Sequence, residues 1–372
     1  MKNSIFPHKV QLSLAILMLS FGCTLYAHPI PPPNLHECRL TDSGCCIPLP
    51  KKRTINFTFH MYPPIQRLRR PAHHVDDKYI QKYKKAYELM RSLPSDDPRS
   101  LLHQANAHCS MCTGGYFQPG IVALMQVHFS WLFFPWHRWF IYFHERILAK
   151  LLGDPNFSLP FWNWDNQIYG NSMPTIFNDN NSALYDLYRD ATHTPETLIR
   201  LDGDNGTRKD SEIVSRNLFQ MYRDVVVPSK AHDFMGGEFR YGDSYDNSST
   251  QEATIGGTIE VGAHGAVHDW VGDPLQPNQR DMGTFATAGC DPIFYAHHAN
   301  VDRLWEVWRT SLPGGPRQVF TDADFLDASF LFYDEDANLV RVKVRDCLDN
   351  KRLGVRYPKI DEDKLWIHYS TP

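Results

Sequence analysis

The sequence has no excess of charge of either sign. Its 38 Lys and Arg nearly balance its 42 Asp and Glu, which leaves a formal net charge of -4 at pH 7. This balance gives no reason to expect binding to nucleic acid or to an anionic membrane surface. The chain also lacks short-period repeats and low-complexity tracts. What remains is a globular protein, and a content of 42% hydrophobic residues with 13% aromatics is enough for a sizeable core.

Long apolar runs are missing as well. The run Leu12–Phe21 near the N-terminus is too short to span a bilayer, so no stable membrane insertion is expected. Lys2 and Lys9 precede it and small or mixed residues follow up to Ala27, a pattern typical of an export signal over residues 1–27. A chloroplast transit peptide is the alternative, but this segment has few serines and no arginine. The sequence therefore predicts the secretory pathway, outside the cell or in a vacuole, ahead of the chloroplast thylakoid lumen.

Cysteines and glycosylation sequons agree with an oxidising route. Of the eight cysteines, signal cleavage would remove Cys23. Residues 28–75 are rich in proline, basic residues and cysteine without sustained periodicity, which predicts an irregular arm held by disulfides. Four of the cysteines could pair in three ways. Five of the remaining cysteines lie in the first third of the chain: Cys38, Cys45, Cys46, Cys109 and Cys112. Five Asn-x-Ser/Thr sequons are also present, at Asn56, Asn156, Asn180, Asn205 and Asn247.

Periodicity predicts a single, mainly α-helical domain over residues 28–372, with long loops and a few short strands. Apolar residues recur at helical steps from Asp76 onwards. Asp97-Pro98 and Asp291-Pro292 each place a capping carboxylate before a proline, which is typical of a helix start. The second of these helices should run to about Arg309. Alternation between Leu339 and Val344 predicts a strand.

Histidine is the unusual residue, with 18 in the chain and several inside aromatic segments. Neutral imidazole is the commonest metal ligand in proteins. His264 and His268 are four residues apart, so on a helical turn both side chains face one way and can reach one metal ion. The alternative is a polar helix face with two unrelated histidines.

A third histidine of this set lies on the next predicted helix. His298 falls on the apolar stripe of that helix and is therefore directed into the core, where an unpartnered polar group is costly. His297 lies about 100° away around the helix, beside the stripe. The alternative is a buried histidine hydrogen-bonded to a neighbour. Three imidazoles together suit a redox metal that keeps an open coordination position.

A second set lies upstream. His128 and His137 would face opposite sides of one unbroken helix, but Pro135 breaks that helix and lets them converge. His108, on the apolar face of the preceding helix, can supply a third nitrogen. His144 lies about 10 Å further along the axis than His137 and is more typical of a core histidine with a polar partner. The other histidines lie in polar or irregular surroundings that favour surface or loop roles: His36, His60, His73, His74, His103, His193, His232 and His368.

Three segments closely resemble the plant polyphenol oxidases, the catechol oxidases and tyrosinases with a coupled dicopper centre. They are Ala107–Cys112 (AHCSMC), Val127–Arg138 (VHFSWLFFPWHR) and Asp291–Arg303 (DPIFYAHHANVDR). The resemblance extends from about Cys38 to about Pro358. It implies a central antiparallel four-helix bundle that holds two copper ions, the first on His108, His128 and His137 and the second on His264, His268 and His298.

The resemblance also implies an activity and its partners. Catechols would be oxidised to ortho-quinones while dioxygen is reduced to water. Dioxygen and small phenols are then the expected partners. Neutral imidazoles suit this chemistry because they accept both oxidation states of copper and leave one face open.

Covalent links are implied too. Cys112 matches a cysteine that forms a thioether with an imidazole ligand, here His128; the alternative is a free thiol near copper. The family pattern pairs Cys38 with Cys46 and Cys45 with Cys109, which would tie the arm to the helix of His108. The loop between Cys38 and Cys45 is shorter than is usual in the family.

Four further positions match residues that surround the copper ions in the family. Phe285 matches an aromatic gate above the second copper, and Glu260 matches a carboxylate that orients a water. Gly265 and Asp269 directly follow two ligands at positions thought to tune activity on monophenols. An asparagine that could help Glu260 is absent at Gly265, and Asp269 is a candidate proton acceptor instead. We therefore expect diphenol oxidation to dominate over weak monophenol hydroxylation.

Three alternatives to a catechol oxidase remain. Hemocyanins use a similar dicopper site as non-catalytic oxygen carriers, and a catechol oxidation assay separates that class. A specialised phenol hydroxylase or coupling enzyme of secondary metabolism would use the same chemistry. An inert protein descended from an oxidase would not be expected to keep all six ligand positions.

Plant relatives usually carry a further C-terminal domain over the copper site. With the chain ending at Pro372, we expect that shielding domain to be absent and activity to need no protease or detergent. The alternative is a truncated or alternative transcript.

Overall fold

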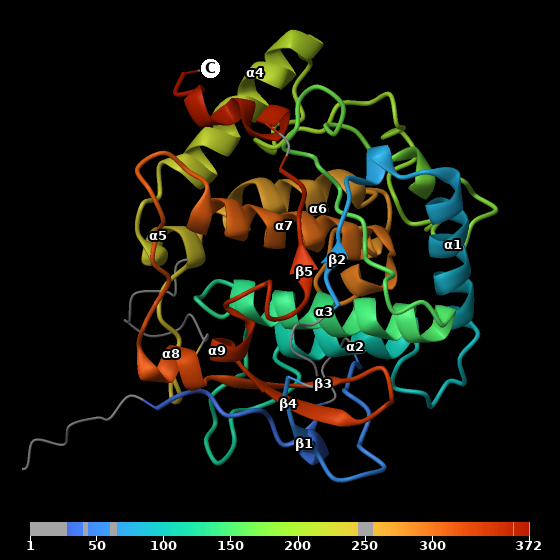
Figure 1. Cartoon of the computed structure of the whole chain (residues 1–372), viewed down its shortest axis with the longest axis vertical. Helices are drawn as coiled ribbons and strands as arrows, with labels where there is room; N and C mark the ends of the chain where they lie inside the picture. Colours follow the sequence, from blue (N-terminus) through green and yellow to red (C-terminus); the bar gives the residue numbers. More distant parts are fainter. Residues whose placement is uncertain (1–27, 40–43, 60–64, 245–255, 360, 372) are drawn as a thin grey trace, which may run out of the picture.

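The computed structural model describes residues 28–39, 44–59, 65–244, 256–359 and 361–371; the expected signal, residues 1–27, lies outside them. The fold is mainly α-helical, with long loops and a few short strands. Four helices form the central bundle (Figure 1): α2 (Leu101–Cys112), α3 (Phe133–Leu152), α6 (Gly265–Val271) and α7 (Ile293–Thr310). The predicted mainly helical fold class is confirmed.

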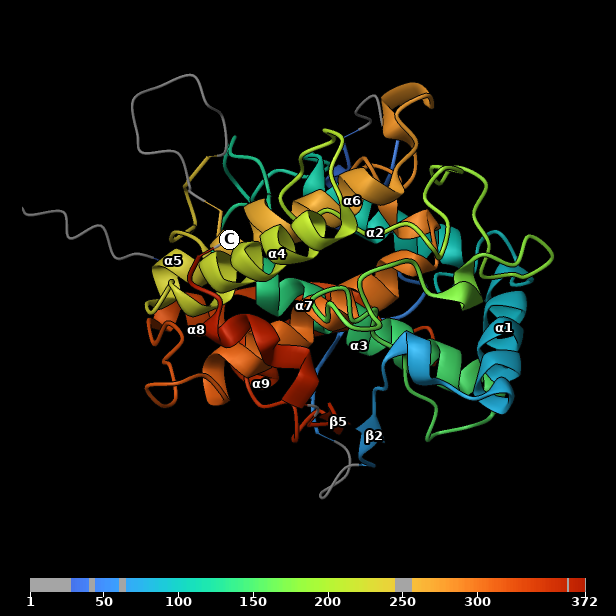
Figure 2. The same ribbon diagram turned by 90° about the horizontal axis from the view of Figure 1, so that it is seen from above.

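Shorter elements surround this bundle. Helix α1 (Asp77–Arg91) lies at one end, and α5 (Ala231–Met235) with α8 (Ala323–Asp327) lies at the other (Figure 2). The rest of the helical segments are α4 (Asp210–Met221), α9 (Val344–Cys347), the π-helical turns η4 (Tyr222–Val226) and η5 (Glu260–His264), and the 3-10 turns η1 (Leu35–Glu37), η2 (Ala72–His74), η3 (Thr175–Phe177), η6 (Pro277–Gln279), η7 (Ala288–Cys290) and η8 (Asp361–His368). Within the described ranges, none of the helices combines the length and apolarity that crossing a membrane requires.

Of the two predicted capping signals, the one before α7 agrees with the structure and the one before α2 differs. Asp76 caps α1 by accepting from the Tyr79 amide. The Asp291 carboxylate accepts from the Ile293 amide at 2.8 Å, just before α7. Helix α2, however, begins three residues later than Asp97-Pro98 suggested. Its cap is Ser100, because the Asp97 carboxylate binds the guanidinium and backbone amide of Arg99 instead.

Pro135 separates the two upstream histidines as predicted. It lies in the first turn of α3, where its missing N–H needs no partner. His128 therefore precedes the helix, in a segment of turns, while His137 lies within it. A buried ion pair then joins α3 to α7, with Arg138 Nε 2.5 Å from Asp302 Oδ1. This pair holds the two helices side by side close to the site, because Arg138 directly follows His137 and Asp302 lies about one helical turn after His298.

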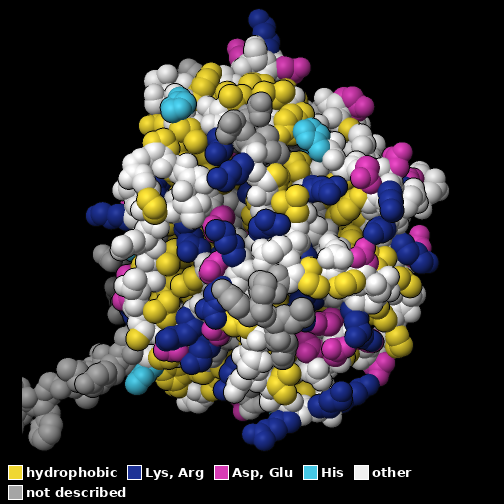
Figure 3. Space-filling view, viewed as in Figure 1, with side chains coloured by type: hydrophobic (Ala, Val, Ile, Leu, Met, Phe, Trp, Pro, Cys, Tyr) yellow, Lys and Arg dark blue, Asp and Glu magenta, His cyan; other side chains and the backbone are white. Residues whose placement is uncertain are grey.

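The strands form two small sheets beside the bundle. In the first, β4 (Leu339–Lys343) pairs antiparallel with β3 (Ser329–Tyr333) and parallel with β1 (Ile55–Asn56). In the second, β2 (Arg67–Leu68) pairs in parallel with β5 (Val355–Arg356). Arg341 and Lys343 of β4 face solvent and Val342 is buried, which is the alternation that predicted this strand. On the face in Figure 3, basic, acidic and apolar side chains are interspersed, in line with the charge balance.

Two disulfides hold the N-terminal arm. The structure pairs Cys38 with Cys46, and Cys45 with Cys109 of α2, the pairing that the resemblance implied. Among the described residues, Cys112, Cys290 and Cys347 are free; Cys112 and Cys347 are buried and Cys290 is half-buried.

Loss of the Cys45–Cys109 disulfide, which closes the longer of the two loops, should lower the free energy of unfolding. Cys45 and Cys109 are separated by 64 residues. Closing a loop of that length lowers the conformational entropy of the unfolded chain and so raises its free energy by about 4 kcal/mol. We expect the Cys45→Ser/Cys109→Ser variant to unfold at a lower urea concentration than the unsubstituted protein. The Cys38→Ser/Cys46→Ser variant, with a separation of 8 residues, is the matched control and should lose less. An equal loss in both variants would contradict this expectation.

Candidate metal centre

The fold brings six predicted histidines into two adjoining triads. In the first, ring centroids lie 5.5 Å apart for His108 and His128, 5.6 Å for His108 and His137, and 5.0 Å for His128 and His137. In the second, the distances are 4.7 Å between His264 and His268 and 5.1 Å between His264 and His298. All six side chains are buried.

Each histidine comes from an element whose position follows from the sequence. His108 lies near the end of α2 and His137 in the second turn of α3. His264 ends η5, and His268 follows one turn later in α6. His298 of α7 belongs to the second triad and also contacts the first, with its ring stacked on that of His137 at 4.4 Å. The triads are therefore adjacent, as a dinuclear centre requires.

Backbone carbonyls determine which nitrogen of four rings faces the centre. The Nδ1 atoms donate to carbonyl oxygens: His108 to Phe285 (3.1 Å), His137 to Phe133 (2.8 Å), His264 to Glu260 (2.9 Å) and His268 to Met282 (2.7 Å). A carbonyl only accepts, so the proton of each neutral ring is on Nδ1 and the Nε2 lone pair is left for another partner.

The remaining nitrogens fit a metal. The Nε2 atoms of His108, His137 and His264 are buried and have no hydrogen-bond partner. An unsatisfied buried polar atom costs about 1–3 kcal/mol, which metal binding would offset. Burial lowers the pKa of His108 to about 3 and that of His268 to about 4. The rings are therefore neutral near pH 7, the state that metal ligation requires.

One short loop supports both triads. The carbonyls of Met282 and Phe285 hold one histidine of each set. Between them, Gly283 packs against Gly272 so closely that a Cβ on Gly272 would lie 2.7 Å from the backbone of Gly283. This support could not be found from the sequence, because backbone carbonyls carry no residue signature.

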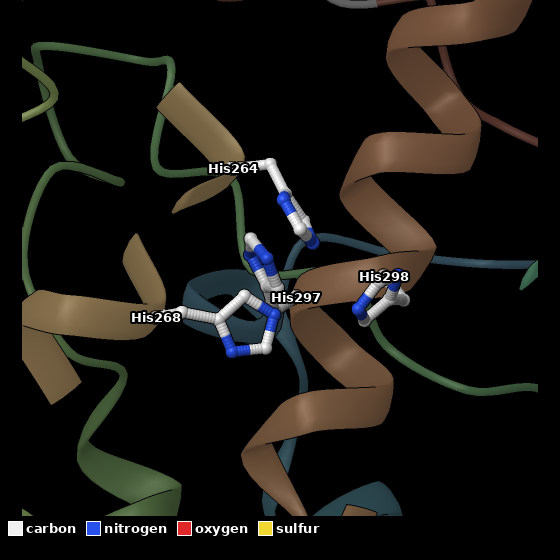
Figure 4. A group of neighbouring side chains, drawn as sticks. All are labelled: His264, His268, His297 and His298. Atoms are coloured by element: carbon white, nitrogen blue, oxygen red, sulfur yellow. The ribbon is translucent and has the colours of Figure 1, made fainter. Parts of the chain in front are cut away.

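His297 lies closer to the second set than the sequence indicated. Nitrogen atoms of His264, His268, His297 and His298 lie within 4.8 Å of one another, and Figure 4 shows the four rings grouped between η5, α6 and α7. The Nδ1 atom of His297 accepts a hydrogen bond from Trp164 Nε1 at 3.0 Å. In contrast, neither ring nitrogen of His298 has a partner.

Cys112 and His128 lie side by side. One atom that could ligate a metal from each of His108, Cys112 and His128 lies within 4.8 Å of the other two. His128 also differs from most of its set, because its Nδ1 atom is buried without a partner. A covalent link to Cys112 remains a prediction that this proximity permits.

A cavity of about 320 Å³ opens beside the triads. Its lining includes His128, Glu260, His264, Gly265, His268, Asp269 and Phe285. The Phe285 ring stacks on His128 with centroids 4.4 Å apart. The ring thus contacts the first triad, and its expected position above the second copper remains a prediction. It still lines the cavity, where a phenol ring could pack against it.

Glu260 is a buried carboxyl at the same cavity. Its Oε1 atom accepts from the Phe129 amide at 2.7 Å, while Oε2 has no partner. Burial raises the pKa of Glu260 well above its usual value. Gly265 and Asp269 line the cavity as well, and partial burial raises the pKa of the more exposed Asp269.

Asp224 supports the site although no sequence motif marks it. It is buried in η4, and its Oδ2 atom accepts from the Ala263 amide at 2.9 Å. Gly262 beside it has non-helical φ/ψ of -94° and -114°. Asp224 thus holds the turn that carries Glu260 and His264.

His144 fulfils its predicted role outside the site. It is buried, its Nε2 lies 2.9 Å from the Tyr87 hydroxyl, and its ring stacks on Tyr295. It is a core histidine with a polar partner.

Comparison with known proteins identifies the family. A model of the common central domain of tyrosinase matches residues 98–311, more than half of the chain. The chain belongs to the tyrosinase family. A second model, the polyphenol oxidase middle domain, matches residues 320–371. The family's centre contains two copper ions, and the two histidine clusters suit such a centre.

Curated relatives extend this finding. The chain is 49% identical to a polyphenol oxidase of Malus domestica over 348 residues, covering 90% of this chain and 56% of that protein. It is 47% identical to aureusidin synthase of Antirrhinum majus over 350 residues, covering 90% and 60%. The chain thus spans little more than half the length of these relatives.

Solved structures agree. The crystal structure of Grenache (Vitis vinifera) polyphenol oxidase superposes with a TM-score of 0.82 at 44% identity, covering 90% of this chain and 98% of that one. A functional unit of octopus hemocyanin, at 19% identity and a TM-score of 0.52, shares the fold.

The predicted secretory route was wrong. Polyphenol oxidases of Malus domestica, Prunus armeniaca, Vicia faba and Vitis vinifera, 45–49% identical, are all named chloroplastic. These names point to a chloroplast rather than to the vacuole or the outside of the cell. A short apolar run after lysines favours transfer into a membrane-bound compartment, but its composition alone does not specify which membrane it meets.

Proposed function

We propose that the chain oxidises o-diphenols to o-quinones and reduces dioxygen to water, with two copper ions held by His108, His128 and His137 and by His264, His268 and His298. The observation that carries this proposal is the pair of buried triads, whose orphaned nitrogens meet beside an open cavity. Bound copper supplies the exchange of electrons between the phenol and dioxygen. Overall, two catechols and one dioxygen give two quinones and two waters.

The residues around the cavity bind the substrate and handle protons. The Phe285 ring offers a flat apolar wall for the phenol. The unpartnered Oε2 of Glu260 can accept a proton or hold a water at the cavity. Asp269, further out, can accept a second proton.

Copper counting combined with oxygen uptake tests the proposal. The metal-free protein should take up two copper ions per chain and then consume oxygen with 4-methylcatechol. Coupling of the two ions should silence the electron paramagnetic resonance signal of the oxidised protein. Uptake of a single copper ion, or two ions with uncoupled signals, would rule out the proposed centre.

Diphenol oxidation should dominate over monophenol hydroxylation. The position after His264 is Gly265, which offers no side chain to help Glu260 hold a basic water near the substrate. We expect a higher kcat/KM for 4-methylcatechol than for tyramine. Faster turnover of tyramine would instead favour a hydroxylase.

A specialised hydroxylase or coupling activity is the second candidate. Two relatives carry such names, aureusidin synthase at 47% identity and (+)-larreatricin hydroxylase of Larrea tridentata at 44%. A panel of simple catechols, (+)-larreatricin and other large phenols would distinguish these activities by their relative kcat/KM.

A thioether between Cys112 and His128 is expected in the copper-loaded protein. The two side chains are adjacent and buried, and the bond would fix a ring that lacks the carbonyl partner of its neighbours. Bond formation removes two electrons and two protons, for which dioxygen would be the oxidant. Mass spectrometry of a digest of protein loaded with copper in the presence of dioxygen should therefore show a cross-linked peptide, lighter by two hydrogen atoms. Cys347→Ser, at another buried thiol, should keep the cross-link and Cys112→Ser should lose it. Separate peptides in the loaded protein would contradict the bond.

The names of the relatives also lead us to infer a chloroplast location for this chain. A fluorescent protein fused after the full chain should accumulate in plastids of leaf cells. Accumulation in the vacuole or cell wall would contradict this inference.

A further inference from the structure

The second triad has one histidine too many. His297 joins His264, His268 and His298 in a group whose ligand-type atoms lie within 4.8 Å of one another. If all four rings bound one ion, the ion would lose the open position that redox chemistry requires. Something must keep one ring out of the coordination.

Trp164 determines the proton position on His297. The indole Nε1 donates to His297 Nδ1 at 3.0 Å, and an indole N–H can only donate. Nδ1 must therefore present its lone pair to Trp164, and the single ring proton must be on Nε2. The Nε2 atom, buried and without a partner, then presents a hydrogen rather than a lone pair to its surroundings.

The four carbonyl-bound rings show the opposite arrangement. Nδ1 of His264 and of His268 donates to a backbone carbonyl, which leaves the Nε2 lone pair available. His297 contacts these two rings, with centroids at 5.1 and 4.8 Å. His298 lies instead against His137 of the first triad, at 4.4 Å.

The position of Trp164 is fixed from both sides. Its ring is fully buried, and its neighbours Asn163 and Asp165 are bound by Arg303 Nη2 at 2.7 and 2.5 Å. Arg303 belongs to α7, the same helix as His297. The donor and its acceptor are therefore held in register by one helix.

We propose that Trp164 is a positioning residue that keeps His297 out of the copper coordination by placing its ring proton on Nε2, so that three imidazoles hold the second copper. This inference rests on the proposed ligand set. In this proposal the indole N–H of Trp164 determines whether three imidazoles bind the second copper and leave one coordination position open, or four bind it and leave none.

Nitrogen-15 NMR of the histidines tests it without any change of sequence. In protein loaded with copper(I), which is diamagnetic, His297 should show a protonated Nε2 and a hydrogen-bonded, unprotonated Nδ1. The signal is identified by its loss in His297→Ala. A metal-bound Nε2 or a protonated Nδ1 on His297 would overturn the proposal.

Trp164→Phe removes only the donor. We expect the His297 proton to move to Nδ1 and the freed Nε2 to bind the second copper, with a fall in kcat because the open position closes. Trp162→Phe is the matched control, because its indole donates to the carbonyls of Gly170 and Ser172. This variant should lose a similar hydrogen bond and leave the His297 spectrum unchanged. An unchanged His297 in Trp164→Phe would contradict the proposal.

Copper counts separate this inference from the proposed function. His297→Ala should still bind two ions per chain, whereas His298→Ala should bind one. If the unsubstituted protein bound fewer than two, the proposed function would fail, but the proton position of His297 could still be measured in metal-free protein. If His297→Ala bound only one copper ion per chain, the inference about His297 would be wrong, while the proposed dicopper function would be unaffected.

Discussion

His264→Ala is expected to lower the copper content from two ions per chain to one and to abolish oxygen uptake with catechols. The Nε2 atom of this ring is buried without a partner, and its Nδ1 is held by the Glu260 carbonyl. Alanine removes one of the three nitrogens proposed to hold the second copper. Mutation of a residue that only hydrogen-bonds a metal ligand typically lowers activity by about 10- to 100-fold. Loss of a ligand itself should lower the activity by more than about 100-fold.

His144→Phe is the matched control, because His144 is equally buried but stacks on Tyr295 outside the centre. The change leaves the Tyr87 hydroxyl without its partner, at a cost of about 1–3 kcal/mol in the free energy of unfolding. Its copper content should stay at two. Elemental analysis and oxygen uptake measure both variants, and a His264→Ala protein that kept both ions would refute the ligand set.

Gly262→Ala is expected to disrupt the second triad through the backbone. A Cβ at this position would lie 2.2 Å from Asp224 Oδ2, and Asp224 cannot retreat without releasing the Ala263 amide. Overpacking of this kind costs about 1–3 kcal/mol. Because the turn carries His264, the affinity for the second copper should fall together with the free energy of unfolding.

Gly265→Ala serves as the comparison for this change. A Cβ on Gly265 would meet its nearest neighbour, the Glu260 carbonyl, at an ordinary 3.6 Å. In a helix, alanine is favoured over glycine by up to about 1 kcal/mol. Thermal unfolding of the metal-free proteins should therefore show a lower Tm for Gly262→Ala and an equal or higher Tm for Gly265→Ala. Equal Tm values in the two variants would show that Asp224 does not restrict the turn.

The coarse architecture and the candidate ligands could be predicted from local pattern. Four-residue spacing put His264 and His268 on one face, and the apolar stripe of α7 directed His298 inward. Pro135 predicted that His128 and His137 come from separate elements. These inferences succeeded because helical periodicity and the geometry of proline act over a few residues. The start of α2 was misplaced because two caps competed, and Asp97 bound Arg99.

What only the tertiary structure decided is which atom of each ring faces the centre. The proton position on His108 depends on the carbonyl of Phe285, 177 residues away in the sequence, and that on His268 depends on the carbonyl of Met282, 14 residues away. The proton position on His297 depends on Trp164. The same holds for the Phe285 ring, which leans on the first triad. Spacing determines on which side of a helix a side chain emerges, but its proton and partner depend on atoms that the fold brings from elsewhere.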